Sequence, residues 1–151
     1  MAISPNDTFT SGQVLTATEC NSFPFGVVAF TLATASDATI TGAEIQITSS
    51  SFTAIANRYY KITYFEPQIG NSSTGFTLSQ IRLTNLAGTL YQQGIVSGTS
   101  LSNSLTTIAV TTLTAGSTVI IASLQSSAGT ASATRAAAAP AFLMVEDIGP
   151  A

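Results

Sequence analysis

Hydrophobic and polar residues alternate along most of the chain after Gly26. In the segment 58–67, Tyr60, Ile62 and Tyr64 share one face of an extended chain, and the residues between them share the other: Tyr59, Lys61, Thr63 and Phe65. A period of two, mixed with short β-branched runs between turn residues, predicts β-strands. The predicted strands are 27–33, 43–50, 58–67, 76–86, 89–96, 105–113, 117–125 and 141–147.

About eight short strands with little helix predict an all-β fold, an antiparallel β-sandwich of the jelly-roll type. In the strand 76–86 the hydrophobic positions shift from Phe76 and Leu78 to Ile81 and Leu83, which predicts a β-bulge. The alanine-rich segment 128–142 contains Pro140 and follows Gly, Ser and Thr residues, so we expect it to be extended or irregular.

The first 25 residues have a different pattern. Thr16 and Glu19 have the spacing of a capping box, in which each side chain satisfies a free backbone amide at a helix start. Pro24 disfavours helical geometry in the residue before it, so the predicted helix covers 17–23. We therefore expect an anchoring arm and short helix over residues 1–25, of which 1–12 reach beyond the domain, and a β-sandwich domain over residues 26–151.

The composition is poor in charge for a β-rich chain. Only 7% of the residues are charged, whereas 45% are hydrophobic, and the net charge is −3; an average soluble domain has about 25% charged residues. Charges on faces and edges are what keep β-sheets from associating. The composition therefore predicts that a large part of the surface is buried against copies of the same chain or in a larger assembly.

Several functional classes do not fit this sequence. Four scattered cations do not form the basic stripe that tracks phosphates, so we expect no nucleic-acid partner. The longest apolar stretch, 136–145, is shorter than the ~20 residues of a membrane-spanning helix, and the first nine residues do not resemble a secretory signal. With one cysteine and no histidine, neither an internal disulfide nor a Cys/His metal site is expected, and we assign no cofactor.

Glu146 and Asp147 are the most prominent candidate catalytic pair. Neighbouring side chains on a strand point to opposite faces, so these two carboxylates do not converge on one substrate atom. We interpret them as the solvated end of the last strand, paired with Arg58 or Arg82. A glycan hydrolase would need one of these acids to share a cleft with a distant carboxylate such as Glu44 or Glu66, and this stays an alternative.

Nucleophilic catalysis lacks a base, because there is no histidine. Lys61 is the sole lysine, and its place among strand tyrosines predicts a surface residue whose stem lies along apolar neighbours. Cys20 lies in the predicted helix, where we expect a small packing residue. No catalytic residue is assigned, and the chain is predicted not to be an enzyme.

The aromatic group Tyr59, Tyr60, Tyr64 and Phe65 could stack on sugar rings, but alternation directs about half of it into the core, so packing is the preferred interpretation. For receptor contact the polar loops 70–75 and 97–104 are better candidates, because loops at a sandwich end carry recognition. Asn6 and Asn71 begin glycosylation sequons, which mean little without a signal peptide.

Two stretches, "FTSGQVLTATECNSFPFGVVAF" (9–30) and "PAFLMVEDIGPA" (140–151), resemble the opening and closing segments of small virion structural proteins of tailed bacteriophages. Between them, "NRYYKITYFEP" (57–67) and "LTAGSTVIIASLQ" (113–125) are similar to strand pairs of trimeric jelly rolls of the tumour-necrosis-factor type. The resemblance implies a homotrimer located in the virion and carries no catalytic residues with it.

The predicted function is a non-enzymatic structural component of a tailed phage virion, a homotrimeric β-sandwich displayed on the particle as a capsid decoration or minor tail protein. The N-terminal arm would bind other virion proteins in the capsid or tail. The alternative is a receptor- or glycan-binding module of a tail or head fibre.

Overall fold

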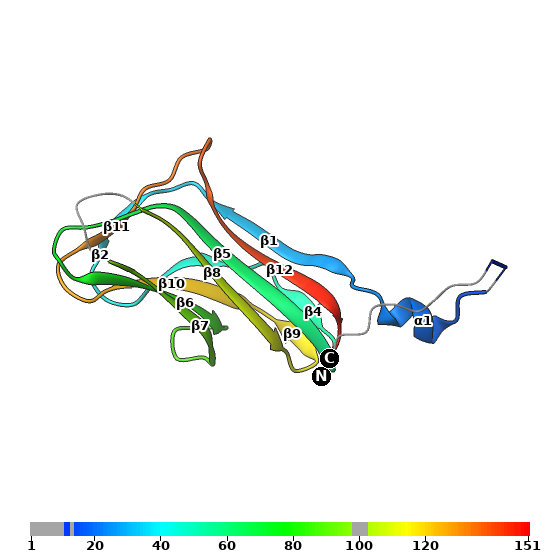
Figure 1. Ribbon diagram of the computed structural model, residues 1–151. Helices are drawn as coiled ribbons and strands as arrows, with labels where there is room; N and C mark the ends of the chain where they lie inside the picture. Colours follow the sequence, from blue (N-terminus) through cyan, green and yellow to red (C-terminus); the bar gives the residue numbers. More distant parts are fainter. Residues whose placement is uncertain (1–10, 13, 98–102) are drawn as a thin grey trace.

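The computed structural model describes residues 11, 12, 14–97 and 103–151. Two antiparallel sheets lie face to face, and a short helix projects from one end (Figure 1). The first sheet has the order β1-β12-β5-β8, formed by Gly26–Ala33, Ala141–Pro150, Arg58–Asn71 and Asn103–Thr112. The second has the order β3-β10-β6-β7, formed by Glu44–Thr48, Ile120–Ser126, Phe76–Leu83 and Leu90–Ser97.

Four shorter strands complete the sandwich. Strand β11 (Ala131–Ala133) pairs with the last residues of β5, and β2 (Asp37–Ile40) pairs with β11, so both extend the first sheet at that end. Strand β4 (Phe52–Ala54) pairs with β9 (Gly116–Thr118). Each of the eight predicted strands corresponds to one main strand. In chain order, the first sheet contains the first, eighth, third and sixth main strands, which is the order of a jelly roll. The predicted fold class is confirmed.

The core lies between the two sheets and follows the period of two. In β12, Ala141, Leu143, Val145 and Asp147 are buried, while the residues between them are partly exposed. Burial alternates in the same way in β8 and over most of β5. The largest enclosed apolar side chains come from both sheets: Tyr60, Tyr64, Ile40, Ile62, Ile69, Ile81, Ile120, Leu124, Leu143 and Val145.

The bulge predicted within strand 76–86 is wrong in its position. Strand β6 pairs with β10 without interruption, and the only register shift beside it comes at Ile81/Arg82, where β7 contains the extra residue. Phe76 and Leu78 are more exposed than Thr77 and Ser79, which are buried. The hydrophobic positions change face because small hydroxyl residues occupy the inner positions at the start of the strand.

These inner hydroxyls pair with polar side chains of neighbouring strands. The Asn71 amide Nδ2 donates to Ser126 Oγ at 2.9 Å and to Thr77 Oγ1 at 3.4 Å, and the Ser79 and Thr107 hydroxyls bond to each other. Buried polar groups are tolerated when they are hydrogen-bonded. Periodicity alone did not show this polar part of the core, because a strand pattern treats threonine and serine as surface residues.

Helix α1 (Ala17–Ser22) has the predicted capping box. Glu19 N donates to Thr16 Oγ1, and Thr16 N donates to Glu19 Oε2. Phe23, the residue before Pro24, is extended and ends the helix. Over the described residues, no helix is both long and apolar enough to span a bilayer.

Candidate functional site

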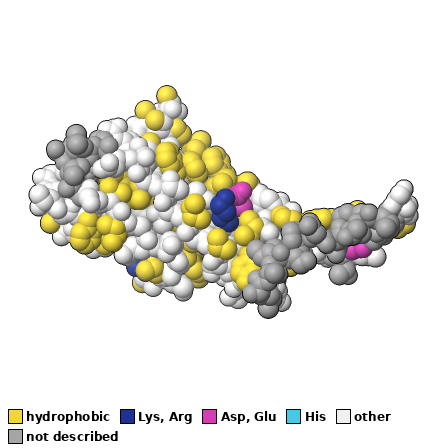
Figure 2. All heavy atoms as spheres, viewed as in Figure 1, with side chains coloured by type: hydrophobic (Ala, Val, Ile, Leu, Met, Phe, Trp, Pro, Cys, Tyr) yellow, Lys and Arg dark blue, Asp and Glu magenta, His cyan; other side chains and the backbone are white. Residues whose placement is uncertain are grey.

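The outer surface of the first sheet carries an apolar area that the alternation leaves outside the core. Its side chains form three rows across β1, β12, β5 and β8. The rows are Leu32–Phe142–Phe65–Thr106, Phe30–Met144–Thr63–Ile108 and Val27–Glu146–Lys61–Val110. We call this surface the apolar face. Figure 2 shows hydrophobic side chains gathered along this side of the molecule, with a basic and an acidic side chain in contact beside them.

The edge strands are the most exposed part of the apolar face. On β1, Val27, Phe30 and Leu32 are 50–55% exposed, and on β8, Ile108 is 46% and Val110 57% exposed. Aromatic side chains continue the surface inward: the Phe142 ring lies 5.9 Å from that of Phe30 and 5.3 Å from that of Phe65, between centroids. Such contacts stabilise neighbouring strands by about 0.5–1.5 kcal/mol each.

Among the described residues, one ion pair lies within the apolar face. Lys61 Nζ lies 3.2 Å from Glu146 Oε2, and their side chains are 40% and 25% exposed. Glu146 Oε2 accepts no aligned hydrogen bond, so the contact is electrostatic only, and exposed pairs contribute at most about 1 kcal/mol. The prediction that Lys61 is a surface residue is confirmed, but Glu146 pairs with Lys61 and not with Arg58 or Arg82.

The middle row contains an unusual polar atom. Thr63 is only 8% exposed, and its Oγ1 has no hydrogen-bond partner among the described residues. Its neighbours in the row are Met144 and Ile108, which offer no polar atom except their backbones. An unsatisfied buried hydroxyl costs about 1–3 kcal/mol. The low exposure of Thr63 shows that its neighbours partly shield the centre of the apolar face from water.

Asp147 lies on the opposite side of the same sheet, as the strand alternation predicts, but it is not solvated. It is 1% exposed and receives two hydrogen bonds from Arg58, from Nε to Oδ2 at 2.5 Å and from Nη2 to Oδ1 at 2.7 Å. The backbone amide of Gly149 also donates to it. The expectation of a solvated strand end is wrong for Asp147, because β12 runs on to Pro150 and Arg58 covers it.

Arg58 also binds the last turn of α1 and the segment between α1 and β1. Its Nη1 donates to Asn21 O and its Nη2 to Phe23 O, each at 2.6 Å. Its Cζ lies 4.0 Å from the centroid of the Phe25 ring. Arginine suits this role because its planar fork donates several bonds at once. We call this group the arm junction, since it fixes where the N-terminal segment leaves the sandwich.

A second buried arginine encloses Glu66 inside the far end of the sandwich. Arg135 donates from Nε to Glu66 Oε1 and from Nη2 to Oε2, both at 2.7 Å, and Tyr64 Oη donates to Oε2 at 2.6 Å. Burial, and then the Glu66 carboxylate, raise the pKa of Tyr64 well above its ordinary value of 10.0. The Glu66 carboxylate is therefore held in a closed network.

The fold places the four acids considered for hydrolysis in different surroundings. Glu66 and Asp147 are each enclosed with an arginine, and Glu146 is on the apolar face. Glu44 begins β3, where its Oε1 accepts from Thr41 N. No group of three or more potential metal ligands occurs among the described residues.

Two other sequence expectations are corrected or refined. Cys20 is exposed and not a packing residue, because α1 projects from the sandwich and has no core beside it. Asn71 is 6% exposed with its amide engaged, so its sequon is not presented for modification; Asn6 lies outside the described residues. Of the aromatic group, Tyr60 and Tyr64 are buried, as alternation predicted for half of it, while Tyr59 and Phe65 are half-buried on the other side.

Of the two loops proposed for receptor contact, the loop 70–75 lies at the end of the sandwich away from the arm junction. In the loop 70–75, Asn71 Oδ1 accepts from Ser73 N, and Ser73 Oγ donates to Ala128 O, so this loop is tied to the turn between β10 and β11. The loop 97–104 lies largely outside the described residues.

Comparison with known proteins shows no established family. No family model matches the chain, and no curated protein matches it. Solved structures similar to it include a domain called CsCBM6-3 from Clostridium stercorarium in complex with cellobiose, with 17% identity, a TM-score of 0.37, and coverage of 78% of this chain and 92% of that one.

A structure of infectious bursal disease virus, Gt strain, is 16% identical with a TM-score of 0.40; the match covers 97% of this chain and 43% of that one. The CBM22-1 xylan-binding domain of Xyn10C from Paenibacillus barcinonensis is 9% identical with a TM-score of 0.33, covering 81% and 87%. All three TM-scores are below 0.5, so we draw no functional argument from these likenesses.

Proposed function

We propose that this protein is a non-enzymatic structural component of a tailed phage virion and that copies of it associate through the apolar face as a homotrimer. The apolar face is the observation that carries the proposal. Soluble monomers rarely expose contiguous apolar patches of more than a few hundred Å², and the low charge of the chain leaves few groups to keep such a face from associating.

The size of the apolar face suits an assembly contact. Strands are about 4.8 Å apart and rise about 3.3 Å per residue, so three rows over four strands cover on the order of 400 Å². Eight of the twelve positions are apolar, so burying the face would contribute roughly 7 kcal/mol of transfer free energy, which is within the range estimated for the cost of association. A second contact on each copy, as in a closed ring of subunits, would make the assembly stable.

The number of copies and the location in a virion come from the resemblance to tailed-phage proteins and trimeric jelly rolls. The arm junction adds a structural reason for the N-terminal arm to bind other virion proteins. Arg58 holds the segment after α1 against the sandwich, so the exposed Val14 and Leu15 are presented at a defined end of the domain. The sandwich would then be displayed on the capsid or tail.

The oligomeric state of the purified chain tests this proposal. Light scattering after size exclusion should give about 3 × 15.4 kDa, or roughly 46 kDa. The substitution Phe30→Asp, on the apolar face, should produce monomers. Ile95→Asp is the matched control, since Ile95 is 60% exposed on β7 of the other sheet, and it should leave the trimer intact.

A wild-type monomer at micromolar concentration, or equal effects of the two substitutions, would overturn the assembly through the apolar face. The arm is tested separately by removing residues 1–15, which leaves the arm junction whole. This truncated chain should form the same oligomer and lose attachment to the particle, and unchanged attachment would contradict the role of the arm.

Glycan recognition remains the second candidate function. The strand tyrosines do not favour it, because Tyr60 and Tyr64 are inside the core. The observation that does favour it is a cavity at another place in the sandwich.

A further inference from the structure

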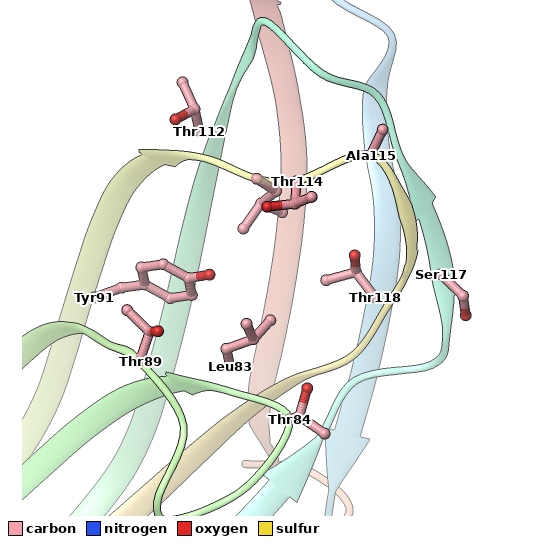
Figure 3. Close-up of a pocket in the computed structure, with 10 residues that line it drawn as sticks. Leu83, Thr84, Thr89, Tyr91, Thr112, Thr114, Ala115, Ser117 and Thr118 are labelled. Carbon is pink, nitrogen blue, oxygen red and sulfur yellow. The ribbon is translucent and has the colours of Figure 1, made fainter.

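A cavity of about 340 Å³ lies at the edge of the sandwich where β7 and β8 meet, across the first sheet from β1. It is formed where the turn between β6 and β7 approaches the segment between β8 and β9. Figure 3 shows Tyr91, Leu83, Thr114 and Thr118 around a common space, whereas Ser117 points away from it. The lining residues are Leu83, Thr84, Thr89, Tyr91, Thr112, Leu113, Thr114, Ala115, Ser117 and Thr118.

The turn that forms one wall is held in a single shape. Thr84 adopts a left-handed conformation with φ of 61°, and its amide donates to Val119 O at 2.9 Å. A Cβ atom on Gly88 would lie 1.7 Å from Leu83 O, so only glycine fits there. Leu83 N donates to Thr89 O at 3.0 Å and closes the turn. A wall built in this way is formed before any ligand arrives, which lowers the cost of binding.

The chemistry of the lining is neutral and rich in hydroxyls. None of the described lining residues is ionic. The side-chain hydroxyls of Thr84, Thr89, Thr114 and Tyr91 bond to no other described residue, whereas Thr118 Oγ1 donates to Gly116 O. Each free hydroxyl can donate one hydrogen bond and accept others. The apolar part of the lining consists of the two leucines, Ala115 and the Tyr91 ring.

We propose that this cavity binds one ring of a neutral saccharide. A pyranose presents an apolar face, which the Tyr91 ring and Leu83 can cover, and a rim of hydroxyls, which the threonines can meet. The volume is at the small end of the ~300–1,000 Å³ range of ligand pockets, so it suits one ring and not an extended chain. Burial raises the pKa of Tyr91, which keeps its phenol neutral. The lining contains no cation that could pair with an acidic sugar.

The site is independent of assembly through the apolar face, so either proposal can fail without the other. To test it, the full chain labelled with ¹⁵N is titrated with methyl glycosides of glucose, galactose, mannose and N-acetylglucosamine, and with glucuronate and sialic acid. At least one neutral glycoside should shift the amide signals of the turn 84–89 and the segment 112–118. Its affinity should not change with salt, because no charge pair is involved.

Three variants test whether the lining residues contribute to the affinity. Tyr91→Ala should weaken binding by about tenfold or more, and Thr114→Val, which keeps the shape of the side chain, by about two- to tenfold through one lost hydrogen bond. Phe76→Ala is the control for loss of an aromatic ring, since Phe76 is at the other end of β6 from Leu83 and does not line the cavity, and it should bind normally. If Tyr91→Ala unfolds the protein, Thr114→Val still decides the outcome.

The proposal is overturned if no neutral glycoside shifts these signals at tens of millimolar, or if the shifts map elsewhere. It is also overturned if an acidic sugar binds more tightly than every neutral one, or if Thr114→Val leaves the affinity unchanged.

Discussion

The two faces of the sheet β1-β12-β5-β8 hold their charged side chains in different environments. Inside, Asp147 and Glu66 are each bound by an arginine with several short hydrogen bonds. Outside, Lys61 and Glu146 form a loose, partly exposed pair among apolar side chains. Glu146 and Asp147 are neighbours in the chain, so a step of one residue along β12 separates the two environments.

The difference shows what each face requires. Water does not reach the inner face, so each charge there needs nearly all its hydrogen-bonding capacity filled by protein atoms. The outer face has only one ion pair among its described residues and leaves its apolar groups open on β1 and β8. In a chain with so few charges, this unequal distribution is the physical basis of the proposed assembly.

Neutralising each of the two neighbouring acids should give the largest difference in stability between the inner and the outer face. Asp147→Asn leaves the buried Arg58 without its counter-charge and should lower the free energy of unfolding by about 3–5 kcal/mol. Glu146→Gln should lower it by no more than about 1 kcal/mol. Urea denaturation of both variants measures the difference, and equal losses would show that Asp147 is not enclosed as described.

Truncating the neighbouring apolar residues should give the next largest difference. Leu143 is fully buried, so Leu143→Ala should cost about 2–5 kcal/mol through the cavity that it leaves. Met144 is on the apolar face, and Met144→Ala should cost about 1 kcal/mol or less in dilute monomer. If copies cover the face, the loss for Met144→Ala grows with protein concentration, and thermal unfolding at two concentrations measures this; a constant loss would count against the covered face.

Alkaline pH should lower the free energy of unfolding through Tyr64, which is on the inner face of the sheet. The pKa of Tyr64 is raised above 10.0 in the folded protein by burial and by Glu66. Above that pH the unfolded chain releases the proton and the folded chain keeps it, so stability falls as the pH rises. Urea midpoints below and above pH 10.0 measure the decline. Tyr64→Phe should make it shallower, leaving the smaller contribution of Tyr91, and an unchanged slope would contradict the assignment.

The smallest expected effect concerns the centre of the apolar face. Thr63→Val replaces the unpartnered hydroxyl with a methyl group of similar size, so it should raise the free energy of unfolding by up to about 1 kcal/mol. Ser79→Ala is the contrast, because it removes a buried hydroxyl that is bonded to Thr107 without adding volume, and it should destabilise. If Thr63→Val destabilises the protein by a similar amount, the hydroxyl has a partner after all.

Much of the fold could be predicted because strand and cap signals are local. The capping box of Thr16 and Glu19 needs only four residues, and alternation in 58–67 separated the inner from the outer side chains of β5. The strands β2, β4 and β11 were missed, and β9 was merged with β10 in the predicted strand 117–125, since three or four residues are too few to show a period. The exposure of Cys20 depends on where α1 lies, which no local pattern contains.

The sequence by itself determined the all-β class, the main strands, the opposite directions of Glu146 and Asp147, and the scarcity of charge, because these follow from composition and from backbone geometry within a few residues. Only the tertiary structure decided that Asp147 binds Arg58 across 89 positions and Glu66 binds Arg135 across 69. It also decided that turns from separate parts of the chain enclose a cavity. Such contacts depend on the order of strands in the sheets, which brings distant segments together and which no local pattern records.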